Sequence, residues 1–237
     1  MREDKEEGIV LSTIKYGDKG LVVNILTHGE GRRAFMASAQ RGKSMHFAML
    51  MPLTNVEFVA SGVKPNQMQR MTEVHLLRPF RSIPFSPVKR AEAFFIAELL
   101  CHAVPNDVPD AELYTFVSHA VAMLDDGMDG DYNFHLFFMM RLAAHLGFAP
   151  DTERSETPIF DLVAGVWTPT LPPHPNVLTD RMADLWHWLT TVTPDNLSSM
   201  PMSRAERQEL ITHMTRYYQL HQPGFRNLTS QSILAQL

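Results

Sequence analysis

The first 80 residues alternate between apolar and polar side chains in short segments that turn-forming residues separate. This alternation predicts five strands, over residues 8–16, 20–27, 32–39, 53–60 and 67–77. Five strands in about 80 residues suit a small OB-fold barrel, because an immunoglobulin sandwich usually needs about seven. We therefore expect an N-terminal five-stranded OB-fold β-barrel.

The apolar period changes to that of helices after residues 79–87, a segment that contains three prolines and excludes a central strand or a continuous helix. We place the domain boundary here, with domains 1–80 and 81–237. Ser86, Asp110 and Ser203 are suitable N-caps. The helices are predicted over residues 86–104, 110–127, 132–147, 179–192 and 203–221.

A Pro-rich stretch, about residues 155–177, breaks the helical pattern. It contains two β-prone pieces, Phe160–Val163 and Val166–Thr168, which Gly165 can connect as a hairpin. The predicted fold class is therefore α+β: a barrel followed by a mainly α-helical domain with a small hairpin-like insertion.

The charge differs between the two halves of the chain. Residues 1–81 hold 12 Lys and Arg against 8 Asp and Glu, a net charge of +4, whereas residues 82–237 hold 9 against 18, a net charge of −9. A basic β-domain favours a polyanionic partner such as a nucleic acid, and an acidic helical domain favours protein partners.

Seven basic residues of the first domain and its boundary are the predicted DNA contacts. Arg41 and Lys43 lie in a Gly- and Ser-containing segment with accessible backbone amides. The full set is Arg32, Arg33, Arg41, Lys43, Lys64, Arg70 and Arg81, and Arg78 could join the same face. Phe35 and Phe58 alternate with apolar residues and are expected in the core, so no dense base-stacking platform is evident. Binding through phosphates should then dominate.

The sequence contains none of the motifs GxxxxGK[ST], GxGxxG, HExxH or GxSxG. The 11 histidines are scattered, and Cys101, the single cysteine, follows an apolar helical pattern typical of a buried, inert thiol. We therefore expect no catalytic residues, no metal and no cofactor. Two alternatives stay open: a protein-interaction scaffold whose barrel binds a protein, and a hydrolase with an unrecognised His/Asp site in the helical domain.

The location of the protein is predicted from what its sequence lacks. The N-terminus, MREDKEEGIV, is charged where a signal peptide has an apolar core. No stretch approaches the roughly 18 apolar residues of a membrane span. A single cysteine also fits a reducing compartment. We expect a cytoplasmic protein without a membrane partner.

Four segments, in order along the chain, resemble the bacterial recombination mediator family RecO. They are EGIVLSTIKYGDKGLVVNILTHGEGRRAFMASAQRGKS near the start, VHLLRPFRSIP at the boundary, RLAAHLGFAPD, and YYQLHQPGFRNLTSQSIL near the end. The resemblance implies an OB-fold that binds single- and double-stranded DNA, strand annealing, and loading of RecA together with RecR. It also implies a bacterial, nucleoid-associated protein that binds the C-terminal tail of single-stranded-DNA-binding protein.

The chain departs from this family at one place. Many relatives carry a four-cysteine zinc site after the equivalent of residues 147–151, where this chain reads Thr152-Glu153-Arg154-Ser155-Glu156. One cysteine cannot supply a tetrahedral Cys₄ site. We expect the 160–168 hairpin to be stabilised by packing, without metal.

Arg141 is the predicted partner-binding residue. It is a lone permanent cation in a helix, residues 132–147, that is apolar almost all round. An arginine in such a run must reach solvent or find an anion. The carboxylate of the acidic, apolar tail that the resemblance implies would suit it. The alternative is a structural arginine paired internally with an Asp or Glu.

Overall fold

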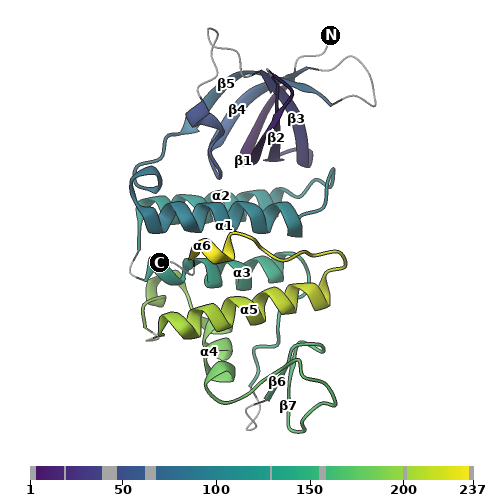
Figure 1. Cartoon of the computed structure of the whole chain (residues 1–237), viewed down its shortest axis with the longest axis vertical. Coiled ribbons are helices and arrows are strands. Elements are labelled where there is room, and N and C mark those ends of the chain that lie inside the picture. The colour runs from purple at the N-terminus through teal and green to yellow at the C-terminus, as the bar shows by residue number, and fades with distance from the viewer. Residues whose placement is uncertain are drawn as a thin grey trace. The chain divides into compact units, whose positions relative to one another are not determined.

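The computed structural model describes residues 4–18, 20–38, 47–61, 68–128, 130–154, 159–199 and 202–234. The chain divides into two compact units, Met1–Asp126 and Gly127–Leu237, which we call the barrel unit and the helical unit. In Figure 1 the purple and blue strands and helices α1 and α2 belong to the first unit, and the elements from α3 onward belong to the second.

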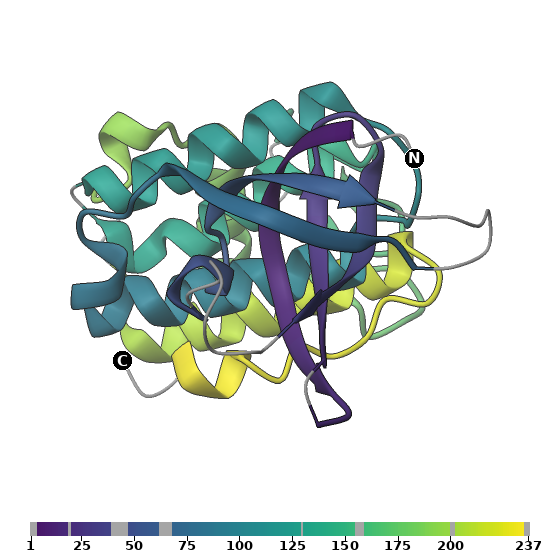
Figure 2. The same cartoon turned by 90° about the horizontal axis from the view of Figure 1, so that it is seen from above.

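The barrel consists of β1 (Asp4–Tyr16), β2 (Gly20–Thr27), β3 (Gly31–Ser38), β4 (Asn55–Ser61) and β5 (Arg70–Arg78). The strands close in the order β1-β2-β3-β5-β4. Neighbouring strands are antiparallel except β3 and β5, which meet in parallel at Met36 and Arg70. This confirms the predicted five-stranded barrel, and Figure 2 shows the curvature of its strands from above.

Strand β1 begins earlier than the sequence pattern predicted. Its first half pairs with β4, from Asp4 opposite Ala60 to Ile9 opposite Asn55, and its second half pairs with β2. A bulge between Val10 and Ser12 shifts the register. Such a bulge bends a strand, which lets one long strand take part in two sides of a closed barrel.

The barrel core is filled by inward side chains, among them Val23, Ile25 and Val56, each fully buried. The rings of Phe35 and Phe58 meet edge to face with centroids 4.9 Å apart, which confirms that both aromatic residues face the core. A 3-10 helix, Phe47–Leu50, precedes β4, and its Leu50 is buried in the same core.

Helices α1 (Pro87–Ala103) and α2 (Ala111–Asp126) complete the barrel unit. The Ser86 hydroxyl accepts a hydrogen bond from the Lys89 amide, and the Asp110 carboxylate accepts one from the Leu113 amide. Both N-caps are those that the sequence predicted. A short 3-10 helix, Ile83–Phe85, leads into α1.

Asp125 attaches α2 to the segment between β5 and α1. Its carboxylate accepts the backbone N–H groups of Arg81, Ser82 and Ile83 at 2.8, 2.9 and 3.0 Å. Burial acts to raise the pKa of the Asp125 carboxyl, but these donors outweigh it and hold the pKa below its ordinary value. The change from strands to helices falls near residue 80, as the sequence indicated, but the compact unit continues to Asp126.

The helical unit contains α3 (Phe134–His145), α4 (Asp180–Thr191), α5 (Arg204–His221) and the short α6 (Gln231–Leu234). Two 3-10 helices, Asp131–Asn133 and Pro194–Asn196, lie between them. Helix α3 contacts α4 and α5, and Figure 1 shows α3 and α5 side by side. The predicted capping box at Ser203 and Glu206 is present.

The insertion forms a three-stranded sheet in the order β7-β6-β8, made of β6 (Ile159–Asp161), β7 (Val166–Thr168) and β8 (Val177–Leu178). The β6–β7 pair is the predicted hairpin, whereas β8 is too short for its pattern to be recognised. Phe160 packs against Trp167 and Trp186, with ring centroids 5.1 and 5.2 Å apart. An aromatic core therefore anchors this sheet.

Among the described residues there is neither a cluster of metal-ligating side chains nor a membrane-spanning helix. No group of three or more His, Cys, Asp or Glu side chains is placed to hold a metal ion. No described helix has both the length and the apolar character needed to cross a membrane. Zinc-free folding stays a prediction, which elemental analysis of untagged protein would test.

Candidate nucleic-acid interface

The outward-facing side chains of β1, β2 and β3 form one continuous surface with two different halves. Residues directly opposite each other in paired strands point to the same face. The register therefore aligns Ile9 with Leu26 and Arg32, and aligns Ile14 with Val22 and Met36. We call the first region, which also includes Ser12 and Asn24, the covered half. The second, which also includes Tyr16 and Arg70, is the open half.

The covered half lies beneath the helices of the barrel unit. Ile9 and Leu26 point outward from the barrel but are each only 1% exposed, because α1 packs against β1. Asn24 donates a hydrogen bond to the Ser12 hydroxyl at 2.8 Å. Burial raises the pKa of the Cys101 thiol on α1, and the nearby Ser12 and Arg32 partly oppose this. This environment makes Cys101 a weak nucleophile.

Arg32 is held inside the covered half. Its Nε donates a hydrogen bond to the Val104 carbonyl at 2.7 Å, and its own carbonyl accepts the Asp107 amide at 3.0 Å. Val104 is the C-cap of α1, where unpaired carbonyls and the helix dipole favour a cation. The structure therefore gives this predicted DNA contact a partner within the unit.

Arg33 is also engaged. Its guanidinium forms ion pairs with Glu30 and with Asp107, the latter at 3.3 Å, and lies over the Phe35 ring at 5.8 Å. Two carboxylates offset its charge, and its side chain is 27% exposed. The adjacent residues Arg32 and Arg33 are predicted DNA contacts, but both side chains have partners within the unit.

Arg78 and Arg81 share a single carboxylate. Asp126 accepts a hydrogen bond from Arg78 Nη2 at 2.7 Å and lies 3.8 Å from Arg81 Nη1. The Arg81 side chain is 80% exposed, so it could still contact an anion at the surface. The positive field of this pair is reduced by the acidic end of α2.

Arg70 differs from the other described arginines of the barrel. It begins β5, where it pairs with Met36 of β3 and Ser61 of β4, and it is exposed. In the described part of the chain no carboxylate forms an ion pair with it. Arg41, Lys43 and Lys64 lie outside the described residues, so their DNA contacts stay predictions.

The open half carries apolar and aromatic side chains that are exposed. Ile14 is 59% exposed and Tyr16 is 64% exposed, although both belong to a regular strand. Met68, two residues before Arg70, is 46% exposed. Exposed apolar groups that share a sheet face with a cation indicate a binding surface. The sequence analysis missed this surface, because alternation alone does not show which outward residues a helix will cover.

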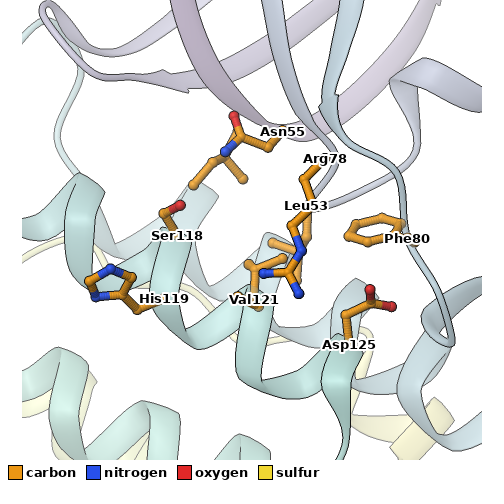
Figure 3. A pocket seen from close by; sticks show the side chains of 10 residues that line it. Leu53, Asn55, Arg78, Phe80, Ser118, His119, Val121 and Asp125 are labelled. Atoms are coloured by element: carbon orange, nitrogen blue, oxygen red, sulfur yellow. The ribbon is translucent and has the colours of Figure 1, made fainter.

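A second feature of the barrel unit is a cavity of about 120 Å³ between the barrel and α2. Figure 3 shows Arg78, Phe80 and Asp125 on one side of it, and Asn55, Ser118 and His119 on the other. No described hydrogen bond joins His119 to Ser118 or Asp125, since the Asp125 oxygens are taken by Arg81, Ser82 and Ile83. Nothing in this geometry activates Ser118 as a nucleophile.

In the helical unit, Arg141 binds the end of another helix. Its guanidinium donates to the carbonyls of Thr190, at 3.3 Å, and Val192, and lies 5.4 Å from the centre of the Phe137 ring. Burial lowers the pKa of Arg141. Helix α3 is mostly buried, as suits its apolar sequence, and the internal partners of Arg141 are carbonyls at the α4 C-terminus instead of an Asp or Glu. Its partner-binding role stays a prediction.

Comparison with known proteins covers nearly the whole chain. The family model described as Recombination protein O N terminal matches residues 1–80, and that of Recombination protein O C terminal matches residues 84–229. A DNA repair protein RecO of Phocaeicola vulgatus is 32% identical over 236 residues, covering 98% of both chains. RecO proteins of Flavobacterium psychrophilum and Porphyromonas gingivalis are each 30% identical over 237 residues, covering 98% and 97% of this chain and 98% and 96% of theirs. The N-terminal match coincides with the five-stranded barrel, and the C-terminal match follows it along the chain. The chain therefore belongs to the RecO family of DNA repair proteins.

Proposed function

We propose that this protein is a DNA-binding recombination mediator that acts without a catalytic step. The observation that carries the proposal is the open half, where exposed apolar and aromatic side chains share a face with Arg70, which has no ion-pair partner among the described residues of this basic barrel. Phosphates of single- or double-stranded DNA would contact Arg70 and the cations Arg41, Lys43, Lys64 and Arg81. Arg32 and Arg33 have partners within the unit, so we expect them to contribute less.

The family resemblance supports the wider role. Under this proposal the protein anneals complementary strands and, with RecR, helps load RecA on DNA in the bacterial cytoplasm, at the nucleoid. The matched relatives carry the name DNA repair protein, which agrees with such a role. The acidic, apolar tail of single-stranded-DNA-binding protein would bind the helical unit at Arg141.

The direct test is fluorescence anisotropy with labelled single-stranded and duplex DNA at several salt concentrations. Each phosphate contact should add about 0.7 to the log–log salt slope for single strands and about 0.9 for duplex. Replacing Arg41, Lys43, Lys64 and Arg70 together by Ala should flatten both slopes. A control removes four arginines from the helical unit, the exposed Arg181, Arg204 and Arg226 and the half-buried Arg207. Unchanged DNA affinity in a folded first variant would overturn the proposal.

The open half also favours one alternative function. Exposed Ile14 and Tyr16 would suit a protein partner as well as unstacked bases, so the barrel could be a protein-interaction scaffold. The salt titration separates the two functions. A scaffold would show little DNA binding and a partner association nearly independent of salt, whereas phosphate contacts require a steep dependence.

The Arg141 part of the proposal has its own test. The tail peptide should bind with weak to moderate affinity, and Arg141→Ala should weaken it. Because Arg141 also binds the α4 carbonyls, a melting curve must accompany each titration. Normal peptide binding by a folded Arg141→Ala variant would remove this residue from the site. Loss of both binding and folding would assign it a structural role.

A further inference from the structure

A groove of about 360 Å³ lies in the helical unit, between the insertion, helix α5 and the segment that leads to α6. Its walls come from three places in the sequence. Asn176 belongs to the insertion, Thr212, Thr215 and Arg216 to α5, and Asn227 to the C-terminal segment. Neither the proposed DNA surface of the barrel nor Arg141 is part of it.

Hydrogen bonds between side chains hold the walls together. Gln219 donates to Asn227 at 2.7 Å, and Gln231 donates to the Thr212 hydroxyl at 3.2 Å, so α5 is bonded twice to the C-terminal segment. Arg216 Nε donates to Asn176 Oδ1 at 2.8 Å, which bonds α5 to the insertion. Side-chain hydrogen bonds within the unit therefore hold the groove in shape.

Arg216 is the cation of this groove. Its Nε is fixed by Asn176, while its Nη1 and Nη2 have no partner among the described residues. Among the described residues no Asp or Glu lines the groove, and the Oε1 of Glu209 lies 3.7 Å from Nε2 of the lining residue His213. Burial lowers the pKa of His213, with Glu209 opposing it, so this ring adds little positive charge at neutral pH.

Thr215 supplies an independent observation. The residue is part of the groove lining and is 6% exposed, and its buried hydroxyl has no hydrogen-bond partner among the described residues. Buried hydroxyls are normally paired, so each exception calls for an explanation such as a bound group. A threonine in a helix can often satisfy its hydroxyl with a carbonyl one turn earlier, and here it does not.

We propose that this groove binds a phosphate group, presented by a nucleic-acid strand. Arg216 would bind the phosphate oxygens through its two free nitrogens, and Thr215 and the Asn176 and Asn227 amides would add neutral donors. The groove is larger than one phosphate requires, which leaves room for the attached sugar. The helical unit would then hold DNA at a place separate from the barrel.

The test uses the full-length protein and two probes. Calorimetry with inorganic pyrophosphate measures the phosphate site alone, and anisotropy with fluorescent oligo-dT measures the strand. Arg216→Ala should weaken pyrophosphate binding about tenfold or more, the expected effect of losing a charge-assisted bidentate contact. It should also lower the oligo-dT salt slope by about 0.7, the contribution of one phosphate.

Two further variants make the result specific. Thr215→Val keeps the side-chain shape and removes only the hydroxyl, so it should fold at least as stably and bind pyrophosphate several-fold more weakly. Arg226→Ala removes an exposed charge next to Asn227, outside the groove lining, and should leave both titrations unchanged.

The outcomes distinguish this proposal from that for the barrel. Loss of pyrophosphate binding with an unchanged oligo-dT slope would identify a free phosphate compound as the ligand and overturn the strand as its source. Equal binding of both probes by wild type, Arg216→Ala and Thr215→Val would overturn the site itself. Arg70→Ala, measured in parallel, reports on the barrel surface independently of either result.

Discussion

The two halves of the barrel's outer surface lie mainly on the same three strands, β1 to β3, with Arg70 of β5 added to the open half, but they have different environments. In the covered half, Ile9 and Leu26 are buried and Arg32 is bonded to the end of α1. In the open half, Ile14 and Tyr16 are exposed and Arg70 has no ion-pair partner among the described residues. Where a helix packs over the strands, the apolar and basic side chains form contacts within the fold. The same residue types without a cover are available to a ligand.

The largest expected effect is a loss of stability when the contact between α2 and the segment before α1 is removed. Asp125→Ala removes the acceptor of three backbone N–H groups, from Arg81, Ser82 and Ile83. The free energy of unfolding should fall by about 3 kcal/mol, since buried donors would lose their partner. Urea denaturation at neutral pH measures this change. Wild-type stability in the variant would show that the junction is held by other contacts.

The same carboxylate makes stability depend on pH in a predictable direction. The folded-state pKa of Asp125 lies below its ordinary value of 3.8, so its stabilisation is complete above that pH and is lost as pH falls through the folded-state pKa. Asp125→Asn should have a lower free energy of unfolding than wild type at neutral pH, and this free energy should change less as the pH is lowered. If the stability of the variant and that of wild type fell in parallel as the pH is lowered, the pH dependence would belong to other groups.

Arg32→Ala should be the next largest change, and it should act on stability. Loss of the Nε hydrogen bond to Val104 should lower the free energy of unfolding by about 2 kcal/mol, because the acceptor lies at a helix end. Arg70→Ala is the matched control on the open half, and should change stability by less than about 0.5 kcal/mol. A stable Arg32→Ala protein with weakened DNA binding would restore Arg32 as a phosphate contact.

Tyr16→Ala should act on single-stranded DNA without affecting the fold. Base stacking on an aromatic side chain contributes about 1–3 kcal/mol, and we expect about 1.5 kcal/mol for the exposed Tyr16 ring. Duplex DNA, whose bases are already stacked, should lose much less affinity. Anisotropy with both probes measures the ratio, and Tyr16→Phe should retain wild-type binding. An equal loss for both probes would argue against base contact.

Arg70→Ala should have the smallest effect on affinity but a distinct salt signature. Loss of one phosphate contact should lower the slope by about 0.7 for single strands and 0.9 for duplex. Arg33→Ala removes a barrel arginine whose charge is already offset by Glu30 and Asp107, so its slope should change less. Identical salt slopes for the two variants would contradict the expected difference between Arg33, which has carboxylate partners, and Arg70.

Much of the fold was determined by the sequence alone. Alternation predicted five strands, and the caps at Ser86, Asp110 and Ser203 begin three helices as expected. The hairpin around Gly165 also formed. These features depend on local backbone and side-chain preferences, which a short stretch of sequence contains. The first residues of β1 were missed because they pair with the distant β4, and β8 was missed because its two residues are too few to show a pattern.

The candidate sites were decided by the tertiary structure. Arg32, Arg33 and Arg70 are equally basic in the sequence, but only the packing of α1 and the position of Asp107 and Glu30 separate the first two from the third. Arg216 and Asn176 are 40 residues apart and meet only when the insertion contacts α5. The sequence determines which charges the chain carries. Long-range packing determines which of them are paired, because a partner from a distant segment is what desolvates or neutralises a side chain.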